Sequence, residues 1–299
     1  FFVSNYVGKT PFAALNFIMP FIMVLGGTGF MLGTGGSALV AKELGCGHKE
    51  KANRIFTMMI GFVVVTGLML TALGIAFIRP IVRLMGASES IMEDCVLYGR
   101  ITIAFTTAFM LQNVFQSFLV VAERPRVGLL VVVAAGVANM VLDALFIAVF
   151  RWGLAGAALA TGIGQCIGGV IPMIYILREK NLPLHFVPFR FEARPILQAC
   201  ANGSSEFMSN ISTSFVSALY NMQLMRMLGE DGVSAYGVLM YVQLIFIGTA
   251  IGYSIGSAPI VSYHYGAGNH DELKNMLKKS LTLMGVTGVA LTALALSLA

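Results

Sequence analysis

The chain has 299 residues, of which 57% are apolar and 11% carry charge, and its formal net charge is +5. A soluble domain carries about 25% charged residues, so this chain has too few to cover a water-facing surface, and a soluble globular protein is excluded. The four cysteines and four histidines form neither a CxxC pair nor a metal-ligand cluster, so a disulfide framework and a zinc site are not indicated. We therefore expect a polytopic membrane protein without a resident cofactor.

Apolar runs alternate with short charged segments along the whole chain. About eight of them are long enough to cross a bilayer. They lie at about 12–41, 55–78, 93–122, 128–150, 153–177, 196–228, 234–265 and 280–299. The longest polar segment, 178–195, is rich in proline and arginine. We interpret 181–195 as a linker between an N-terminal lobe, 1–180, and a C-terminal lobe, 196–299.

One stretch of the sequence occurs twice. Gly26–Ala52 is a glycine-rich apolar helix followed by a Gly-x-Gly turn and a charged segment, and Ile247–Leu273 repeats this plan. A gapless alignment pairs the glycines of the two turns, Gly45 with Gly266 and Gly47 with Gly268. Matched turn glycines favour duplication over chance. The copies begin an even number of spans apart, which predicts two pseudo-symmetric lobes running in the same direction as a parallel repeat.

The loops predict an orientation in the membrane. Loops 42–54, 123–127, 178–195 and 266–279 alternate onto one side and hold most of the 19 lysines and arginines. That side should be cytoplasmic. The chain starts at Phe1 and stops inside an apolar run, so we expect a piece of a longer protein that lacks most of its first helix.

The first candidate site is an acid deep in an apolar helix. Asp143 lies inside the span at 128–150, where an ionisable residue costs several kcal/mol unless it is paired or functional. Asn139 lies one turn earlier on the same face, and Thr161 on the next helix adds a hydroxyl oxygen. Carboxylate and amide oxygens suit Na⁺, and a carboxylate can also carry a proton. Alternatively, Asp143 only holds neighbouring helices together.

Other polar groups are weaker candidates. Glu206 is an acid about ten residues into the span at 196–228. It is either a second cation-linked or substrate-linked acid or, if the helix begins late, a charge near the helix N-terminus. Gln112, Asn113 and Gln116 form a polar group inside the span at 93–122. These three either line a central cavity or bond helices together in lipid.

Three stretches resemble the multidrug and toxic compound extrusion (MATE) family, most closely its MepA-like and DinF-like bacterial branch. They are the helix end GSALVAKELGCG, its partner YSIGSAPIVSYHYGAGNHDEL, and Asn139–Ile147 followed by Gly153–Thr161. The resemblance implies twelve helices in two lobes of six, of which this chain would hold the second to the ninth. In Na⁺-coupled relatives an Asn, an Asp and a Thr bind the cation, and Asn139, Asp143 and Thr161 match that pattern. The fourth ligand there is an Asp on the first helix, which this chain lacks.

The resemblance implies a secondary transporter and not an enzyme. We expect a monomer in the plasma membrane of a bacterium that exports organic, often cationic, drugs and other xenobiotics by alternating access, driven by Na⁺ or H⁺, with no nucleic-acid partner. One alternative is a flippase for lipid-linked oligosaccharides, which would need a cavity lined by several basic residues. The other is a membrane-embedded enzyme, which would need a constellation such as HExxH or two close acids.

Overall fold

The computed structural model describes residue 3 and residues 6–87 and 89–298, and every regular element among them is a helix. The elements are α2 (Lys9–Gly45), α3 (Lys49–Leu84), α4 (Glu89–Ala104), α5 (Thr106–Val121), α6 (Pro125–Asp143), the π-helix η1 (Ala144–Val149), α7 (Gly153–Arg178), α8 (Ala193–Gly266) and α9 (His270–Leu298). Six helical segments are long and apolar enough to cross a membrane, and the bent pair α4–α5 makes a seventh. The chain is therefore an all-α, multi-pass membrane protein, as the composition predicts.

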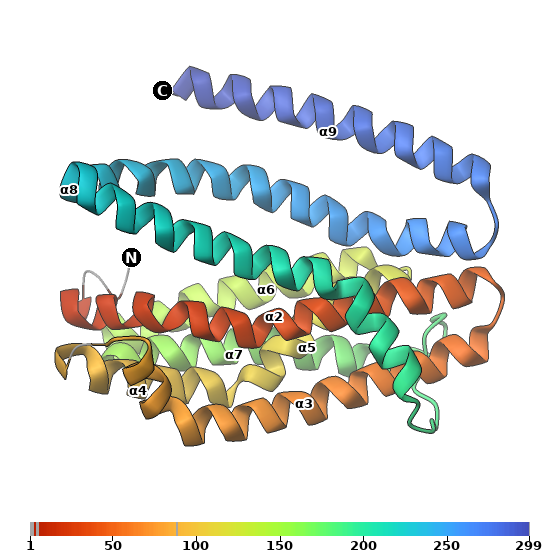
Figure 1. Ribbon diagram of the computed structural model, residues 1–299. Helices are drawn as coiled ribbons and strands as arrows, with labels where there is room; N and C mark the ends of the chain where they lie inside the picture. Colours follow the sequence, from red (N-terminus) through yellow and green to blue (C-terminus); the bar gives the residue numbers. More distant parts are fainter. Residues whose placement is uncertain (1–2, 4–5, 88, 299) are drawn as a thin grey trace.

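Helices α2 to α7 form one bundle, α8 lies along its side against α2, and α9 lies beyond α8 (Figure 1). The two spans expected at 196–228 and 234–265 both belong to α8. Figure 1 shows α8 turning back sharply, so that its two arms and α9 run antiparallel. Both ends of α8 contact α2, at Ala199–Gly203 and at Tyr263–Gly266. α2 is therefore the helix along which the two parts of the molecule meet.

The two Gly-x-Gly turns are built in the same way. In the first, the N–H of His48 donates to the carbonyl oxygen of Glu43 at 2.9 Å, and in the second Asn269 donates to His264 at 3.0 Å. The second glycine of each turn has a positive φ, 83° at Gly47 and 68° at Gly268. A helix that ends in this hydrogen-bond pattern needs a left-handed residue, which glycine adopts without a steric penalty. The charged segment 42–54, expected as a loop, is therefore mostly helical.

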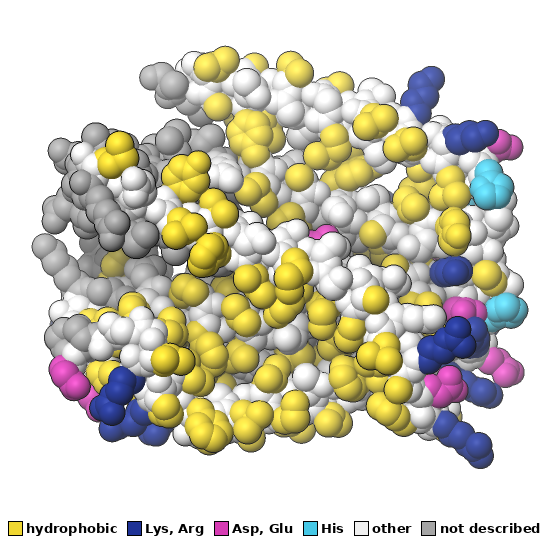
Figure 2. Space-filling model, viewed as in Figure 1, with side chains coloured by type: hydrophobic (Ala, Val, Ile, Leu, Met, Phe, Trp, Pro, Cys, Tyr) yellow, Lys and Arg dark blue, Asp and Glu magenta, His cyan; other side chains and the backbone are white. Residues whose placement is uncertain are grey.

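The charged loops meet at one end of the molecule, which we call the basic end. A cavity of about 310 Å³ there is lined by the end of α2, the start of α3, the α5–α6 turn, Pro183 and the second arm of α8. Figure 2 shows lysine, arginine and histidine side chains gathered at this end, beside a broad apolar surface. On α3 that surface is a stripe of exposed side chains at helical spacing: Val65, Leu68, Met69, Leu73 and Phe77. Such a stripe on the outside of a bundle faces lipid.

The buried core lies within the first bundle. Fully buried Phe118 packs edge-on against Phe56, with ring centroids 5.1 Å apart. Phe186, from the segment between α7 and α8, covers Phe56 from the other side at 5.0 Å. This segment therefore packs as part of the bundle and does not hang free as a flexible connection.

The linker expected at 181–195 lies mostly in the segment between α7 and α8, residues 179–192, while residues 193–195 belong to α8. We keep the name linker for 179–192, and it follows α3 in a fixed register. Alternate linker residues meet α3 residues one turn apart: the N–H of His185 donates to Oδ1 of Asn53 (2.8 Å), the N–H of Val187 donates to Oγ1 of Thr57 (3.1 Å), and the Phe189 ring lies over Gly61. An extended chain advances about 6.6 Å in two residues and a helix about 6 Å in four. These two advances are nearly equal, so alternate residues of the linker can bond to consecutive turns of α3.

The span expected at 93–122 is broken. α4 and α5 meet at Phe105 with a bend of 52°. Neither proline nor glycine lies at the break. The Phe105 ring occupies the space where a Cβ atom on Gly162 of α7 would lie. Tertiary packing of an aromatic ring against a glycine thus sets the bend and brings α4 close to α7 beside Thr161.

Candidate cation and transport site

The helix that carries Asp143 changes its winding at that residue. α6 ends at Asp143 and continues as the π-helix η1. Within η1 the N–H of Phe150 donates to the carbonyl oxygen of Leu145 at 2.9 Å, five residues back. Short π-helical turns within α-helices are frequent at functional sites. Asp143 is therefore placed at a locally widened turn.

Asp143 is a partly buried residue of the first bundle. Its Oδ1 is buried and has no hydrogen-bond partner within the described part of the chain. Tyr98 of α4, which is 1% exposed, lies close enough to interact electrostatically with Asp143. The Tyr98 hydroxyl also lies beside the hydroxyl groups of Thr102 and Thr161. The structure thus brings Asp143 and Thr161 together around Tyr98, a residue that the sequence did not single out.

Asn139 lies at the same helix interface but one turn away. Its Cβ packs against Gly164 of α7, three residues beyond Thr161. The described hydrogen bonds do not join Asn139 to Asp143 or to Thr161. Asn139 therefore faces α7, whereas Thr161 contacts Tyr98 of α4, and the joint action of Asn139 and Thr161 on one ion stays a prediction.

Few buried side-chain oxygens lack a hydrogen-bond partner within the described residues. Besides Oδ1 of Asp143 they are Oγ1 of Thr102, Oγ1 of Thr107 and Oε1 of Gln165, and of these Thr107 lies against Gly67 of α3. The part of the chain described here holds no group of three His, Cys, Asp or Glu side chains that could bind a metal ion. One carboxylate among neutral oxygens suits a proton or a small monovalent cation better than a divalent metal, because a divalent ion usually takes several carboxylates.

The polar group on α5 is divided between two environments. Asn113 is buried, and its Nδ2 donates to the Gly26 carbonyl oxygen of α2 at 3.4 Å. Gln112 packs against Gly168 of α7. These contacts favour the helix-bonding alternative for Gln112 and Asn113. A cavity role for partly buried Gln116 stays a prediction.

Glu206 lies well inside α8. The helix begins at Ala193, so Glu206 is roughly 20 Å from its N-terminus and is not a first-turn charge. Its side chain is partly buried, and the next residue, Phe207, packs against Gly27 of α2. Glu206 is therefore placed beside the contact between α8 and α2, where the two lobes meet, and its role stays a prediction.

The two lobes touch at the basic end through a symmetric backbone contact. A Cβ atom at Gly45 would overlap the carbonyl oxygen of Tyr263, and one at Gly266 would overlap that of Lys42. Gly45 and Gly266 are equivalent positions of the repeat, and so are Lys42 and Tyr263. Each helix end therefore makes the same contact with the other, and any side chain at either glycine would push them apart.

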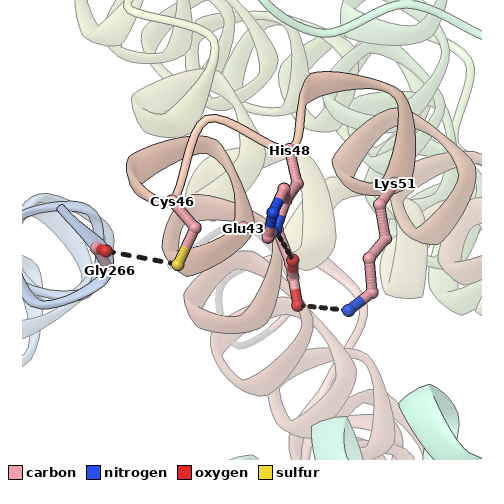
Figure 3. A network of polar contacts seen from close by, with 5 residues as sticks. All are labelled: Glu43, Cys46, His48, Lys51 and Gly266. Carbon is pink, nitrogen blue, oxygen red and sulfur yellow. Dashed lines mark hydrogen bonds and ion pairs between the residues drawn. The ribbon is translucent and has the colours of Figure 1, made fainter.

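Side chains reinforce this contact. In Figure 3 the Cys46 thiol points at the Gly266 carbonyl oxygen of the neighbouring helix, 3.2 Å away. Glu43, whose side chain is 12% exposed, accepts from Lys51 at 2.8 Å and contacts Nδ1 of His48 at 3.1 Å. These bonds join the end of α2 to the start of α3, so the turn that carries Cys46 is held in place.

Apolar helices in two parts that meet along α2, with a buried carboxylate oxygen that has no hydrogen-bond partner among the described residues, define a multi-pass helical membrane protein with a candidate ion site. The sequence model of the MatE family matches residues 1–145 and 207–299. The chain belongs to the MatE family.

Curated relatives cover nearly the whole chain. The "Probable multidrug resistance protein YoeA" of Bacillus subtilis (strain 168) is 24% identical over 307 residues, which is 98% of this chain and 65% of that protein. The "Multidrug export protein MepA" of Staphylococcus haemolyticus (strain JCSC1435) is 23% identical over 292 residues, which is 96% of this chain and 63% of that protein. The chain thus spans a little under two thirds of the length of these relatives.

Solved structures share the fold. A multidrug resistance MATE transporter of the MOP superfamily, solved in an outward-facing conformation, superposes with a TM-score of 0.92 at 21% identity, over 98% of this chain and 65% of that one. A MOP superfamily transporter from Pyrococcus furiosus also gives a TM-score of 0.92 at 21% identity, over 100% of this chain and 66% of that one. At these identities the likeness is one of fold.

Proposed function

We propose that the protein is a secondary transporter that exports organic drugs and other xenobiotics from a bacterium, driven by Na⁺ or H⁺. Membership of the MatE family and the names of the curated relatives support the substrate class. The observation that carries the coupling is the buried Oδ1 of Asp143, which has no hydrogen-bond partner among the described residues and lies at the start of a π-helix. In this proposal the transported molecule and the coupling ion are its only small-molecule partners, and it works as a monomer.

The coupling acts through the charge of Asp143. An ionised carboxylate in a low-dielectric lobe has to be hydrated or paired. Binding a proton or Na⁺ removes that requirement and changes which packing of α4, α6 and α7 is more stable. Because η1 has an irregular hydrogen-bond pattern, it is the part of α6 that can rewind when the charge changes. Ion binding and drug release are then linked through one free energy.

The Gly45–Gly266 contact is the closed gate in this proposal. The basic end faces the cytoplasm by the positive-inside rule, so a structure closed there corresponds to an outward-open state. Transport requires the α2 and α8 ends to separate and the opposite ends to approach. Small contacts between glycines suit such a gate, since no large side chain has to be repacked when it opens.

The two alternatives have less support. A flippase for lipid-linked oligosaccharides needs a basic cavity between the lobes, but the basic cavity at residues 51–58 and 188–195 lies between α3 and the linker. A membrane-embedded enzyme needs a paired constellation near Asp143, and the groups described around it are hydroxyls and amides.

The test uses the full-length gene in a bacterium that lacks its own efflux pumps. Accumulation of a cationic fluorescent dye is measured with and without Na⁺ at two values of pH. Asp143→Asn should abolish the cation-dependent part of efflux, and Tyr98→Phe should weaken it while keeping the volume of the ring. Glu50→Gln is the control, because that carboxylate is 93% exposed at the basic end.

Unchanged cation dependence in Asp143→Asn would remove the coupling role from Asp143. A wild-type strain that accumulates as much dye as a strain without the gene would remove the efflux function itself. Equal losses in Asp143→Asn and Glu50→Gln, with less protein in the membrane, would show a folding defect and contradict a specific role for the buried acid.

A further inference from the structure

A cavity of about 780 Å³ opens at the basic end, on the side of α3 away from the Gly45–Gly266 contact. One wall is a single face of α3, with Lys51, Arg54, Ile55 and Met58 at helical spacing. The other wall is the linker and the start of α8: Pro188, Phe189, Arg190, Glu192 and Pro195. The cavity therefore combines three cations and one acid with apolar side chains.

The cations are not all neutralised by protein acids. Lys51 bonds to Glu43 at 2.8 Å. Arg54 has only a long contact of 3.9 Å with Glu50, on an exposed part of the helix. For Arg190 the structure gives no ion pair among the described residues. Arg54 and Arg190 therefore retain donors for an anion, and the planar guanidinium group binds phosphate oxygens in pairs.

The side chains around the cavity indicate that the anion is a lipid headgroup and not free phosphate. Phe189 and Phe191, on either side of Arg190, are 41% and 67% exposed. Exposed phenylalanine side chains beside basic residues insert at the boundary between lipid headgroups and acyl chains. Phe189 lies over Gly61, and Gly61 is about 10 Å from Arg54 along α3. This distance is comparable with the thickness of the interfacial layer of one leaflet, about 5–8 Å. The arginines thus lie at headgroup depth, and Met58 and Phe189 lie toward the acyl chains.

We propose that this cavity binds an anionic phospholipid of the cytoplasmic leaflet, with its phosphate on Arg54 and Arg190 and its glycerol and upper acyl chains against Met58, Ile55 and Phe189. Anionic lipids attract basic groups at that surface with about 1 kcal/mol for each lysine or arginine. The linker wall is held by the bonds from Asn53 and Thr57, so the site is formed before the lipid arrives. The inference does not depend on efflux, because it uses only this cavity and the orientation of the basic end.

The test uses the full-length protein purified in detergent. Its thermal stability is followed while phosphatidylglycerol, phosphatidylcholine or free inorganic phosphate is added, and native mass spectrometry counts bound lipid. Phosphatidylglycerol should raise the melting temperature and remain bound, whereas phosphatidylcholine and inorganic phosphate should do neither. Arg54→Gln with Arg190→Gln should weaken phosphatidylglycerol binding by about 25-fold, about fivefold for each arginine.

Arg83→Gln is the matched control, because Arg83 lines a separate cavity at the opposite end of α3. It should leave the effect of phosphatidylglycerol unchanged. If the double variant does not purify, Arg190→Gln alone is measured, since this residue is an exposed part of the linker. Equal effects of the two lipids, full binding in the arginine variants, or the same stabilisation by inorganic phosphate would each overturn the proposal.

Discussion

The bonds between the linker and α3 predict how strongly the linker is held. We consider the double variant Asn53→Ala with Thr57→Val. It removes the acceptors for the N–H groups of His185 and Val187, at 2.8 Å and 3.1 Å. Asn53 is only 8% exposed, so water cannot easily replace the lost oxygen. A buried donor left without a partner costs about 1–3 kcal/mol, and an ordinary hydrogen bond contributes about 1 kcal/mol.

The buried N–H of His185 accounts for about 1–3 kcal/mol and the N–H of Val187 for about 1 kcal/mol. The free energy of opening the linker should therefore fall by about 2–4 kcal/mol. The sum is an upper range, because Oγ1 of Thr57 also donates to the carbonyl oxygen of Asn53 at 2.9 Å and the two sites are coupled. Since about 1.4 kcal/mol is a factor of ten, local opening should become about 30 to 700 times more frequent. Amide hydrogen exchange by mass spectrometry of the peptide that contains His185 and Val187 measures this directly.

Thr282→Val is the matched control for that experiment. It also replaces a hydroxyl by a methyl group, but Oγ1 of Thr282 bonds only to its own helix, at the carbonyl oxygen of Lys278. It should leave exchange in the linker unchanged. Exchange less than threefold faster in the double variant would refute the reasoning, and so would an equal acceleration across all helices, which would mean that the linker does not open independently.

Two further predictions concern the gate and the core. Ala267→Cys should form a disulfide with Cys46 under oxidising conditions when the basic end is closed, because Sγ of Cys46 lies 3.2 Å from the neighbouring Gly266 carbonyl oxygen. Adding Gly266→Val should lower the yield severalfold, as counted by mass spectrometry of the linked peptides, and an unchanged yield would contradict the close glycine contact. Phe118→Ala should lower the free energy of unfolding by about 3–5 kcal/mol, since its ring is fully buried. Phe215→Ala, at a ring that is 64% exposed, should change it by less than about 0.5 kcal/mol, and equal melting temperatures for the two variants would argue against this core.

Much of the fold can be predicted from the sequence because a membrane imposes simple rules. Long apolar runs predict the helices, and the matched glycines predict that the turns at Gly47 and Gly268 are alike, which the hydrogen bonds of the two turns reproduce. Residues of three of the expected loops, Lys49, Glu123 and Pro183, also line one cavity, and the side of the membrane on which they lie stays a prediction. These features depend on composition and on local backbone conformation, and both can be read along the chain.

Features that depend on contacts between distant segments could not be predicted. The bend at Phe105 comes from a ring packed against Gly162, and the local sequence at the bend contains neither proline nor glycine. Tyr98 joins the candidate site because that bend brings α4 to α7. The π-helix after Asp143 also has no signal in the apolar run around it. By contrast, an acid within an apolar span could be found from sequence, because its isolation is itself the signal.

The contact between Gly45 and Gly266 has a consequence for the history of the chain. Residue 45 meets residue 263 and residue 266 meets residue 42, so the contact is isologous, the kind that a two-fold dimer makes. Two separate copies of one lobe would have been able to form it before their genes were joined. Fusion then required no new complementary surface, only a connecting segment, and afterwards each glycine was constrained by the backbone of the other copy.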